Sequence, residues 1–125
     1  MAQCPGFNDT DILQAISDMD DDKLHDCDFG VVKMSKDGVV QAVNNAEVEL
    51  SGLSQSAFID KNFFTQVAPC TNNYMVAEKY RKLGELDETI AYVFTYRMKP
   101  TPVHLRMLKS QAFESQYLLV ERSEP

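Results

Sequence analysis

Three strand-like segments fill most of the last third of the chain, and they constrain the fold more than any other feature. The segments 88–99, 102–110 and 115–123 are rich in β-branched and aromatic residues. Earlier in the chain, two β-branched runs flank Lys36-Asp37-Gly38, and the Asp37-Gly38 pair is typical of a tight hairpin turn. The sequence therefore predicts five strands, two before and three after a central stretch.

The central stretch favours short helices. Its first part, "NNAEVELSG", offers Asn44 or Asn45 as a helix cap and Gly52 as the residue that ends the helix. A second helix-prone run, 74–83, is closed by Gly84. Two strands, several helices and three strands in this order predict an α+β fold, with a central antiparallel five-stranded sheet and helices on one face. A hydrophobic cleft between sheet and helices is the natural place for a ligand.

The N-terminal segment is strongly acidic, with eight aspartates and one lysine in the first 30 residues. Asn8 or Asp9 is placed to cap a helix there. An apolar stripe at helical spacing follows, made of Ile12, Leu13, Ile16 and Met19. We expect residues 1–28 to form a weakly held N-terminal helical cap on a core of residues 29–125. An ordinary solvated acidic helix is the alternative.

Composition narrows the classes of function. The chain has 125 residues, which suits a single domain, and a net charge of −7. That charge argues against nucleic acid or an anionic membrane as the main partner. No apolar run is long enough to span a membrane, and the first residues lack the basic and apolar regions of a signal peptide. We expect a cytoplasmic protein that is monomeric or weakly dimeric.

The three cysteines, Cys4, Cys27 and Cys70, cannot all pair with one another. Their spacing relative to His25 and His104 does not suit a metal site. The simplest interpretation is a set of free thiols in a reducing cytoplasm, with Cys4 near the terminus and Cys27 either packed or exposed.

Several motifs point to one family. "NNAEVELSG" is similar to the Asn-x-Ala…Gly signature of PAS domains, while "KNFF", "VAPCT" and "YVFTYRMKPTPV" resemble the photoactive yellow protein family. The resemblance extends from about Asp11 to Val120, nearly the whole chain. It implies a PAS fold and a blue-light photoreceptor that carries p-coumaric acid as a thioester on Cys70. In this family light isomerises the double bond, a buried glutamic acid passes a proton to the phenolate, and the N-terminal region loosens as the signal.

Three residues match functional positions of the family. Cys70 ends a stiff apolar segment and matches the attachment point of the chromophore. The alternative interpretation is a buried, inert cysteine. Glu47 matches the proton donor of the family. Burial in an apolar pocket would raise its pKa and favour the neutral acid, which can donate a proton. The alternative is a solvated glutamate in the first turn of the helix, and Glu49 serves as the solvated comparison. Ser51 matches a position whose hydroxyl supports the hydrogen-bond network of the phenolate. The alternative is that Ser51 is an ordinary residue at the C-terminus of a helix.

Two positions depart from the family pattern. Val43 stands where a tyrosine usually donates a second hydrogen bond to the phenolate, and Leu53 replaces an arginine that shields the ring. Gln41, Asn44 and Asn45 are the candidates to compensate, although an immediate neighbour on a strand points to the opposite face. Losing a hydrogen bond to a charged group costs about 1.5–3 kcal/mol. We therefore expect a raised chromophore pKa, with protonated and ionised forms coexisting near neutral pH.

The resemblance also outlines a chromophore pocket. Tyr92, Phe94, Tyr96 and Met98 alternate along a strand and would face one side, although a plain sheet face packed on helices has the same pattern. Met98 matches a methionine that assists thermal return to the dark state, and the Cys70 N–H would bond the thioester carbonyl. The expected lining is Val32, Val43, Leu53, Phe63, Val67, Ala68, Pro69, Tyr92, Phe94, Tyr96 and Met98.

Two other functions compete with the photoreceptor. The first alternative is a PAS module that binds a small ligand or a partner without responding to light. Val43 and Leu53 support this alternative, because they depart from the family pattern. A cysteine-dependent hydrolase is poorly supported, because neither His25 nor His104 lies in a setting that suggests a base for Cys70. We therefore expect a protein that is not an enzyme. Its signal would pass by contact to an unknown downstream signalling protein.

Overall fold

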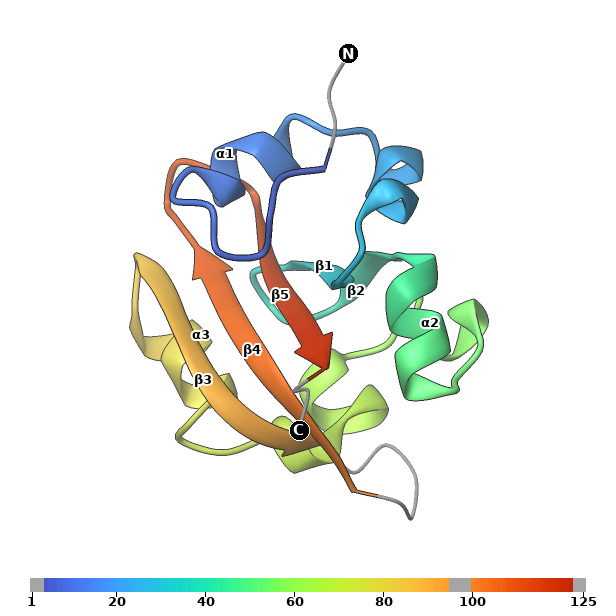
Figure 1. Ribbon diagram of the computed structural model, residues 1–125. Helices are drawn as coiled ribbons and strands as arrows, with labels where there is room; N and C mark the ends of the chain where they lie inside the picture. Colours follow the sequence, from blue (N-terminus) through green and yellow to red (C-terminus); the bar gives the residue numbers. More distant parts are fainter. Residues whose placement is uncertain (1–3, 95–99, 123–125) are drawn as a thin grey trace.

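A five-stranded antiparallel sheet lies at the centre of the computed structural model, which describes residues 4–94 and 100–122 (Figure 1). The strand order is β2-β1-β5-β4-β3, so the first hairpin lies beside the last strand. The strands are β1 (Gly30–Ser35), β2 (Val40–Val43), β3 (Leu86–Phe94), β4 (Thr101–Lys109) and β5 (Ser115–Arg122). The antiparallel five-stranded sheet predicted from the sequence is confirmed.

The first hairpin forms where the sequence predicts it. Gly38 has φ 89°, a left-handed conformation that a residue with a side chain rarely adopts, and its N–H donates to the Ser35 carbonyl at 2.9 Å. Beyond the turn, Val32 pairs with Val43. β4 begins at Thr101, one residue before the predicted strand, and its Pro102 pairs with Val93 of β3. The predicted extension of β3 over residues 95–99 lies outside the described residues.

One face of the sheet packs against short helices. These are α2 (Asn45–Ser51), η2 (Gln55–Ala57), the π-helical turn η3 (Phe63–Val67), η4 (Pro69–Thr71) and α3 (Ala77–Lys82). Apolar side chains from the strands and from these helices form one buried cluster, which we call the inner core. The predicted helix over 74–83 begins later and is shorter. Its end also differs, because Leu83 is already extended and Gly84 has no positive φ.

The N-terminal cap covers the opposite face of the sheet (Figure 1). It contains α1 (Ile12–Ser17) and the 3-10 helix η1 (Asp21–Asp26). The predicted apolar stripe packs on Leu108, Tyr117 and Leu119 of the sheet, so the cap docks on its own domain. The predicted side-chain caps are wrong, because Asp11 lies at the N-cap without a side-chain bond and Asp9 accepts from the Gly6 N–H at 2.8 Å.

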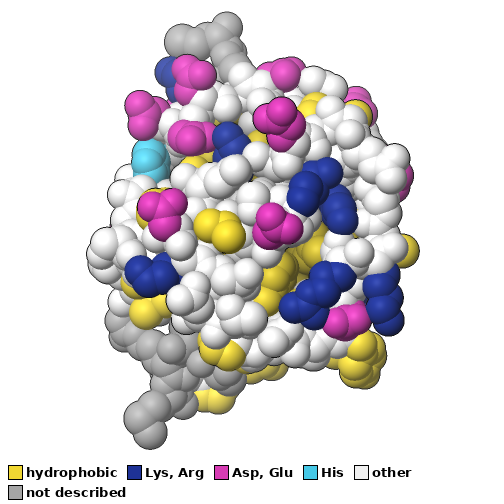
Figure 2. All heavy atoms as spheres, turned by 180° about the vertical axis from the view of Figure 1, so that it is seen from behind, with side chains coloured by type: hydrophobic (Ala, Val, Ile, Leu, Met, Phe, Trp, Pro, Cys, Tyr) yellow, Lys and Arg dark blue, Asp and Glu magenta, His cyan; other side chains and the backbone are white. Residues whose placement is uncertain are grey.

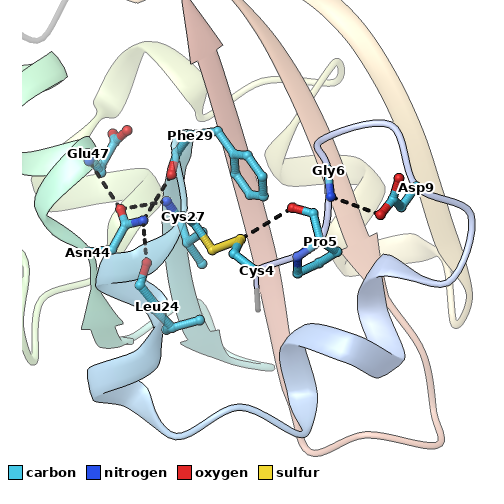
Figure 3. The surroundings of a disulfide bond; sticks show 10 residues. Cys4, Pro5, Gly6, Asp9, Leu24, Cys27, Phe29, Asn44 and Glu47 are labelled. Carbon is cyan, nitrogen blue, oxygen red and sulfur yellow. Dashed lines mark hydrogen bonds between the residues drawn. A yellow bond between two sulfur atoms is a disulfide. The ribbon is translucent and has the colours of Figure 1, made fainter. Parts of the chain in front are cut away.

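A disulfide closes the cap, contrary to the free thiols expected from the sequence. Cys4 and Cys27 are joined across a sequence separation of 23, with their Cα atoms 5.1 Å apart (Figure 3). The prediction failed because spacing alone cannot show which cysteines a fold brings together. Here the N-terminal segment turns back along the sheet, and Cys4 meets the residue that leads into β1.

Arg106 of β4 holds the same segment from the sheet side. Its guanidinium donates to the carbonyl oxygens of Phe7 and Asp9 at 2.8 and 2.7 Å. Two further bonds of 2.8 Å each, from Nε and one terminal nitrogen, reach the two carboxylate oxygens of Asp87. The Asp87 hydrogen bond raises the pKa of Arg106, so this side chain stays charged although it is buried.

Charge is distributed unevenly over the surface. Figure 2 shows acidic side chains gathered at the end of the molecule that carries the cap, and lysine and arginine side chains gathered towards the side of α3 and β3. Lys79, Arg81 and Lys82 all lie in α3. No helix among the described residues is long and apolar enough to cross a membrane.

Candidate functional site around Cys70 and Glu47

Two consecutive helical turns, η3 and η4, place Cys70 against the inner core. The Asn62 side chain caps η3 by accepting from the N–H groups of Phe64 and Thr65 at 3.0 and 3.1 Å. Pro69 then opens η4, where its missing N–H is not needed. Cys70 is the free cysteine of the chain; it is half-buried and packs against the inner core. A free thiol at the edge of an apolar core is the arrangement expected of an attachment point.

The Cys70 carbonyl is held by two side chains that the sequence did not single out for this role. It accepts from the Tyr92 hydroxyl at 2.6 Å and from Asn73 Nδ2 at 3.0 Å. Asn73 Nδ2 also lies 2.7 Å from the Tyr92 hydroxyl oxygen. Among the described residues no acceptor takes the Cys70 N–H. A bond from this N–H to a thioester carbonyl stays a prediction.

Most of the expected pocket residues come together in the inner core. The rings of Tyr92 and Phe94 meet edge to face with centroids 6.1 Å apart. Pro69 is the exception, because its side chain is exposed and serves to begin a turn rather than to line the interior. Tyr96 and Met98 lie outside the described residues. Packed in or against the cluster are Val32, Val43, Leu53, Phe63, Val67, Ala68, Tyr92 and Phe94.

Asn44 caps α2, as predicted, and its amide makes four buried hydrogen bonds (Figure 3). Its Oδ1 accepts from the N–H groups of Glu47 and Val31 at 3.1 and 2.9 Å. Its Nδ2 donates to the carbonyls of Leu24 and Phe29, both at 2.9 Å. One side chain thus joins α2, the start of β1 and the cap. Because its oxygen and its nitrogen each make two hydrogen bonds within the protein, Asn44 cannot supply the hydrogen bond that a tyrosine at position 43 would donate.

Glu47 is fully buried, with 0% exposure, whereas Glu49 is exposed. The predicted contrast between the two glutamates is therefore confirmed. The Glu47 carboxyl lies against Gly30 at the start of β1, so closely that a Cβ at Gly30 would be 2.2 Å from Oε1. Burial penalises the ionised form of a carboxyl and favours the neutral acid, which can donate a hydrogen bond.

Ser51 ends α2 and is 3% exposed. Its hydroxyl donates to the Val48 carbonyl at 3.3 Å and accepts from the Leu53 N–H at 3.1 Å. Gly52 follows with φ 75°, the left-handed conformation that commonly ends a helix. These bonds are those of a helix C-terminus, so a role for Ser51 in a phenolate network stays a prediction.

The side chain of Val43, which has no hydrogen-bond donor, is buried at the end of β2. Gln41 is exposed and accepts from the Ser115 hydroxyl at 2.7 Å, so it points away from the inner core. Asn45 is exposed as well, and its N–H donates to His25 Nδ1 at 3.0 Å. The compensation considered from the sequence is therefore wrong for all three candidates, because two are bonded elsewhere and the third faces solvent.

Neither histidine faces Cys70. His25 belongs to η1 in the cap. His104 lies two residues from Arg106 on β4, hence on the cap side of the sheet, whereas Cys70 packs on the inner core. The structure thus offers no histidine base for a cysteine-dependent hydrolase. Among the described residues, no three histidine, cysteine or acidic side chains are grouped to hold a metal ion.

Comparison with known proteins places the fold and the family. No protein-family model matches the chain. The photoactive yellow protein of Rhodothalassium salexigens is 36% identical over 119 residues, covering 93% of this chain and 95% of that protein. The photoactive yellow protein of Halochromatium salexigens is 34% identical over the same shares of both chains.

Solved structures agree with these relatives. The photoactive yellow protein domain of the sensor histidine kinase Ppr from Rhodospirillum centenum matches with a TM-score of 0.78 at 28% identity, covering 87% of this chain and 98% of that domain. A PAS domain of an HTR-like protein from Haloarcula marismortui matches at 0.64 and 12% identity, covering 82% and 91%, which shows the PAS fold alone. With two relatives above 30% identity across 93% of its length, the chain belongs to the photoactive yellow protein family of PAS-domain photoreceptors.

Proposed function

We propose that this chain is a blue-light photoreceptor that carries p-coumaric acid as a thioester on Cys70. The observation that carries the proposal is that this member of the family has both a free cysteine at the edge of the inner core and a fully buried carboxyl, Glu47. When bound, p-coumaric acid supplies the absorption of light and the trans–cis isomerisation. The chain's own residues supply attachment, an apolar enclosure and a proton.

Cys70 has the surroundings that attachment requires. Its thiolate is the nucleophile for acylation, and the resulting thioester is neutral, so burying it carries no penalty for an isolated charge. The Cys70 N–H donates to no acceptor among the described residues. In this proposal it donates to the thioester carbonyl. Phe63, Phe94 and Ala68, all buried in the inner core, exclude water from the attached group.

Glu47 acts as proton donor in this proposal. As a neutral acid it donates a hydrogen bond to a phenolate, whereas a carboxylate would repel one. Once Glu47 has given up its proton, an ionised carboxylate is left in a dry site, which is costly and favours rearrangement. Asn44 ties the first turn of this helix to Leu24 in the cap. Loosening of the cap is therefore the expected signal, read by a downstream signalling protein in the cytoplasm.

Val43 and Leu53 tune the chromophore in this proposal. Neither side chain can donate a hydrogen bond to a phenolate, and Gln41, Asn44 and Asn45 do not replace the donor. A missing hydrogen bond to a charged group is worth about 1.5–3 kcal/mol, or on the order of one to two pKa units. The pKa of the bound chromophore is accordingly raised, and its protonated form coexists with the phenolate near neutral pH.

A PAS module that binds a ligand or partner without responding to light is the second candidate. It is favoured by Val43, because the buried position of the usual tyrosine holds an aliphatic side chain. The two candidates differ in whether Cys70 forms a covalent adduct. They make the same expectation for the fold, so only chemistry at Cys70 separates them.

Acylation of the apoprotein tests the proposal. The chain is mixed with activated p-coumarate, and its mass and visible spectrum are compared with those of Cys70→Ala. We expect one adduct on Cys70, a visible band that bleaches reversibly under blue light, and a pH titration with two coexisting forms near neutrality. Absence of an adduct would favour the second candidate. If the bound chromophore stays fully ionised down to mildly acidic pH, the proposal that Val43 and Leu53 raise its pKa is wrong.

A further inference from the structure

The amide of Asn73 bridges the attachment loop and the segment that leads into α3. On one side its Nδ2 lies 3.0 Å from the Cys70 carbonyl and 2.7 Å from the Tyr92 hydroxyl. On the other side its Oδ1 accepts from the N–H groups of Met75 and Val76 at 2.9 and 3.2 Å. The donor and acceptor halves of one side chain thus have separate tasks.

The donor half constrains Cys70 specifically. Tyr92 donates to the same carbonyl at 2.6 Å from β3, so two donors from different parts of the chain converge on one oxygen. The Thr71 N–H, on the other end of that peptide group, donates to the Ala68 carbonyl at 2.8 Å. With both ends bonded, the peptide group that follows Cys70 cannot rotate freely. The direction in which the Cys70 side chain leaves the backbone is thereby fixed.

We propose that Asn73 is a positioning residue for the covalent site, which acts with Tyr92 by fixing the Cys70 carbonyl. This inference rests on the proposed function, and it concerns how the attachment point is held rather than whether it is used. A rigid attachment point cannot follow the attached group after isomerisation, so strain remains that favours thermal return to the dark state. Releasing the carbonyl relaxes this strain and slows the return.

Asn73→Asp separates the two halves of the amide. The carboxylate keeps an acceptor for the N–H groups of Met75 and Val76 but has no donor for the Cys70 carbonyl. Its second oxygen also competes with that carbonyl for the Tyr92 hydroxyl proton, because the atom it replaces lies 2.7 Å from this hydroxyl. Asn72→Asp is the matched control, because it makes the same chemical change one residue earlier, where the side chain is exposed and its Oδ1 accepts from Arg81. Tyr92→Phe provides a second variant that removes the other donor and keeps the ring.

The first readout needs no chromophore. Apoprotein labelled with 13C at the cysteine carbonyls is measured by infrared spectroscopy, and the Cys70 contribution is identified by its absence from the spectrum of Cys70→Ser, which keeps the labelled carbonyls of Cys4 and Cys27. We expect the Cys70 carbonyl band to move to higher frequency in Asn73→Asp and in Tyr92→Phe, because each loses a donor, and to stay in place in Asn72→Asp. An unchanged band in both site variants would overturn the inference.

The second readout uses the acylated protein. We expect thermal return after a blue flash to slow by about tenfold in Tyr92→Phe, in line with the loss of one hydrogen bond, and at least as much in Asn73→Asp. It should match the parent chain in Asn72→Asp. If the parent chain takes up no chromophore, the proposed function fails. If the parent chain is acylated and returns normally but both site variants return at the same rate, the positioning role fails while the function stands.

Discussion

Glu47 and Glu49 are two residues apart on one short helix, yet the first is fully buried and the second is exposed. The difference comes from the helix period, because two positions along a helix turn the side chain by more than a right angle. Gly30 completes the arrangement, since the absence of a side chain there makes room for the Glu47 carboxyl. A buried acid therefore depends on a glycine 17 positions earlier in the chain.

Gly30→Ala tests this dependence. The new Cβ would stand 2.2 Å from Glu47 Oε1, so the carboxyl must move or the strand must shift. We expect the free energy of unfolding to fall by about 1–3 kcal/mol, as for other overpacked sites, together with a shifted absorption band in the acylated protein. Urea titration and the visible spectrum measure the two effects. Gly6→Ala is the control, because its Cβ would meet the side chain of Asp9, which is exposed and can move.

Helix α2 is tied to its surroundings at its first turn rather than along its length. Asn44 satisfies two N–H groups and two carbonyls there, which belong to α2, β1 and the cap. The cap side also contributes His25, whose Nδ1 accepts from the Asn45 N–H at 3.0 Å. Any displacement of the helix that carries Glu47 is therefore passed to η1 through these bonds.

Asn44→Ala measures how strongly the elements are joined. The substitution leaves three buried backbone groups without their partner, the N–H groups of Val31 and Glu47 and the Phe29 carbonyl, while the Leu24 carbonyl keeps its bond from the Cys27 N–H. We therefore expect a loss of roughly 3 kcal/mol or more in the free energy of unfolding. Asn45→Ala is the matched control, since that side chain is exposed and its loss should change stability by about 0.5 kcal/mol or less. Equal stabilities of the two variants, measured by urea titration, would contradict the joining role of Asn44.

Local signals account for what the sequence predicted at the level of elements. Asp37-Gly38, the Asn44 cap and the Gly52 end each act within a few residues, so each could be recognised from neighbouring letters. The roles that sequence reasoning missed depend on distant partners. Asn73 looks like an ordinary turn residue until β3 brings Tyr92 beside it, and the second pair of bonds made by Asn44 reaches residues 15 and 20 positions away.

The whole molecule has two cores, one on each face of the sheet. The inner core surrounds the candidate site, and the other packs the cap on β4 and β5. Both cores contain side chains from alternate positions of the same strands, as the two faces of a strand require. The sequence could predict the cap and its apolar stripe. It could not predict the pairing of Cys4 with Cys27 or the bonds from Arg106 to Phe7 and Asp9, because these join segments far apart in the chain.

Alkaline pH should act on the cap side of the sheet. Burial, reinforced by Asp21, raises the pKa of Tyr117 to about 12. The folded state therefore holds this proton more tightly than the unfolded state, whose tyrosine titrates near its ordinary value of about 10. The contribution to stability is complete below about pH 10 and is lost as the pH rises towards 12. We expect Tyr117→Phe to reduce the loss of stability between these pH values, in urea titrations of the apoprotein; a slope remains, because burial also raises the pKa of Tyr80.

Tyr74→Phe provides the control for this pH dependence, because that ring is 78% exposed. It should leave the alkaline slope of the parent chain unchanged. An identical slope in Tyr117→Phe would mean that other groups account for the loss of stability.

Cys4→Ser tests what the disulfide adds to the cap. A crosslink with a sequence separation of 23 restricts the unfolded chain, and its loss is expected to lower the free energy of unfolding by roughly 3 kcal/mol. Cleavage near the N-terminus by a protease should become faster in parallel. Cys70→Ser, compared as apoprotein, loses a thiol but keeps the crosslink and should be cleaved like the parent chain. Equal cleavage of Cys4→Ser and the parent would contradict the expectation.

The crosslink also sets how far an undocked cap can extend. An open chain of 23 residues could stretch to about 80 Å from its anchor before β1, whereas a ring of the same contour reaches about half that distance. Oxidised protein would therefore present its released cap as a short ring held near the sheet, and reduced protein as a long single strand. The capture radius for a downstream partner, and the light-induced change in hydrodynamic size, would then differ between the two forms even where their colour is the same.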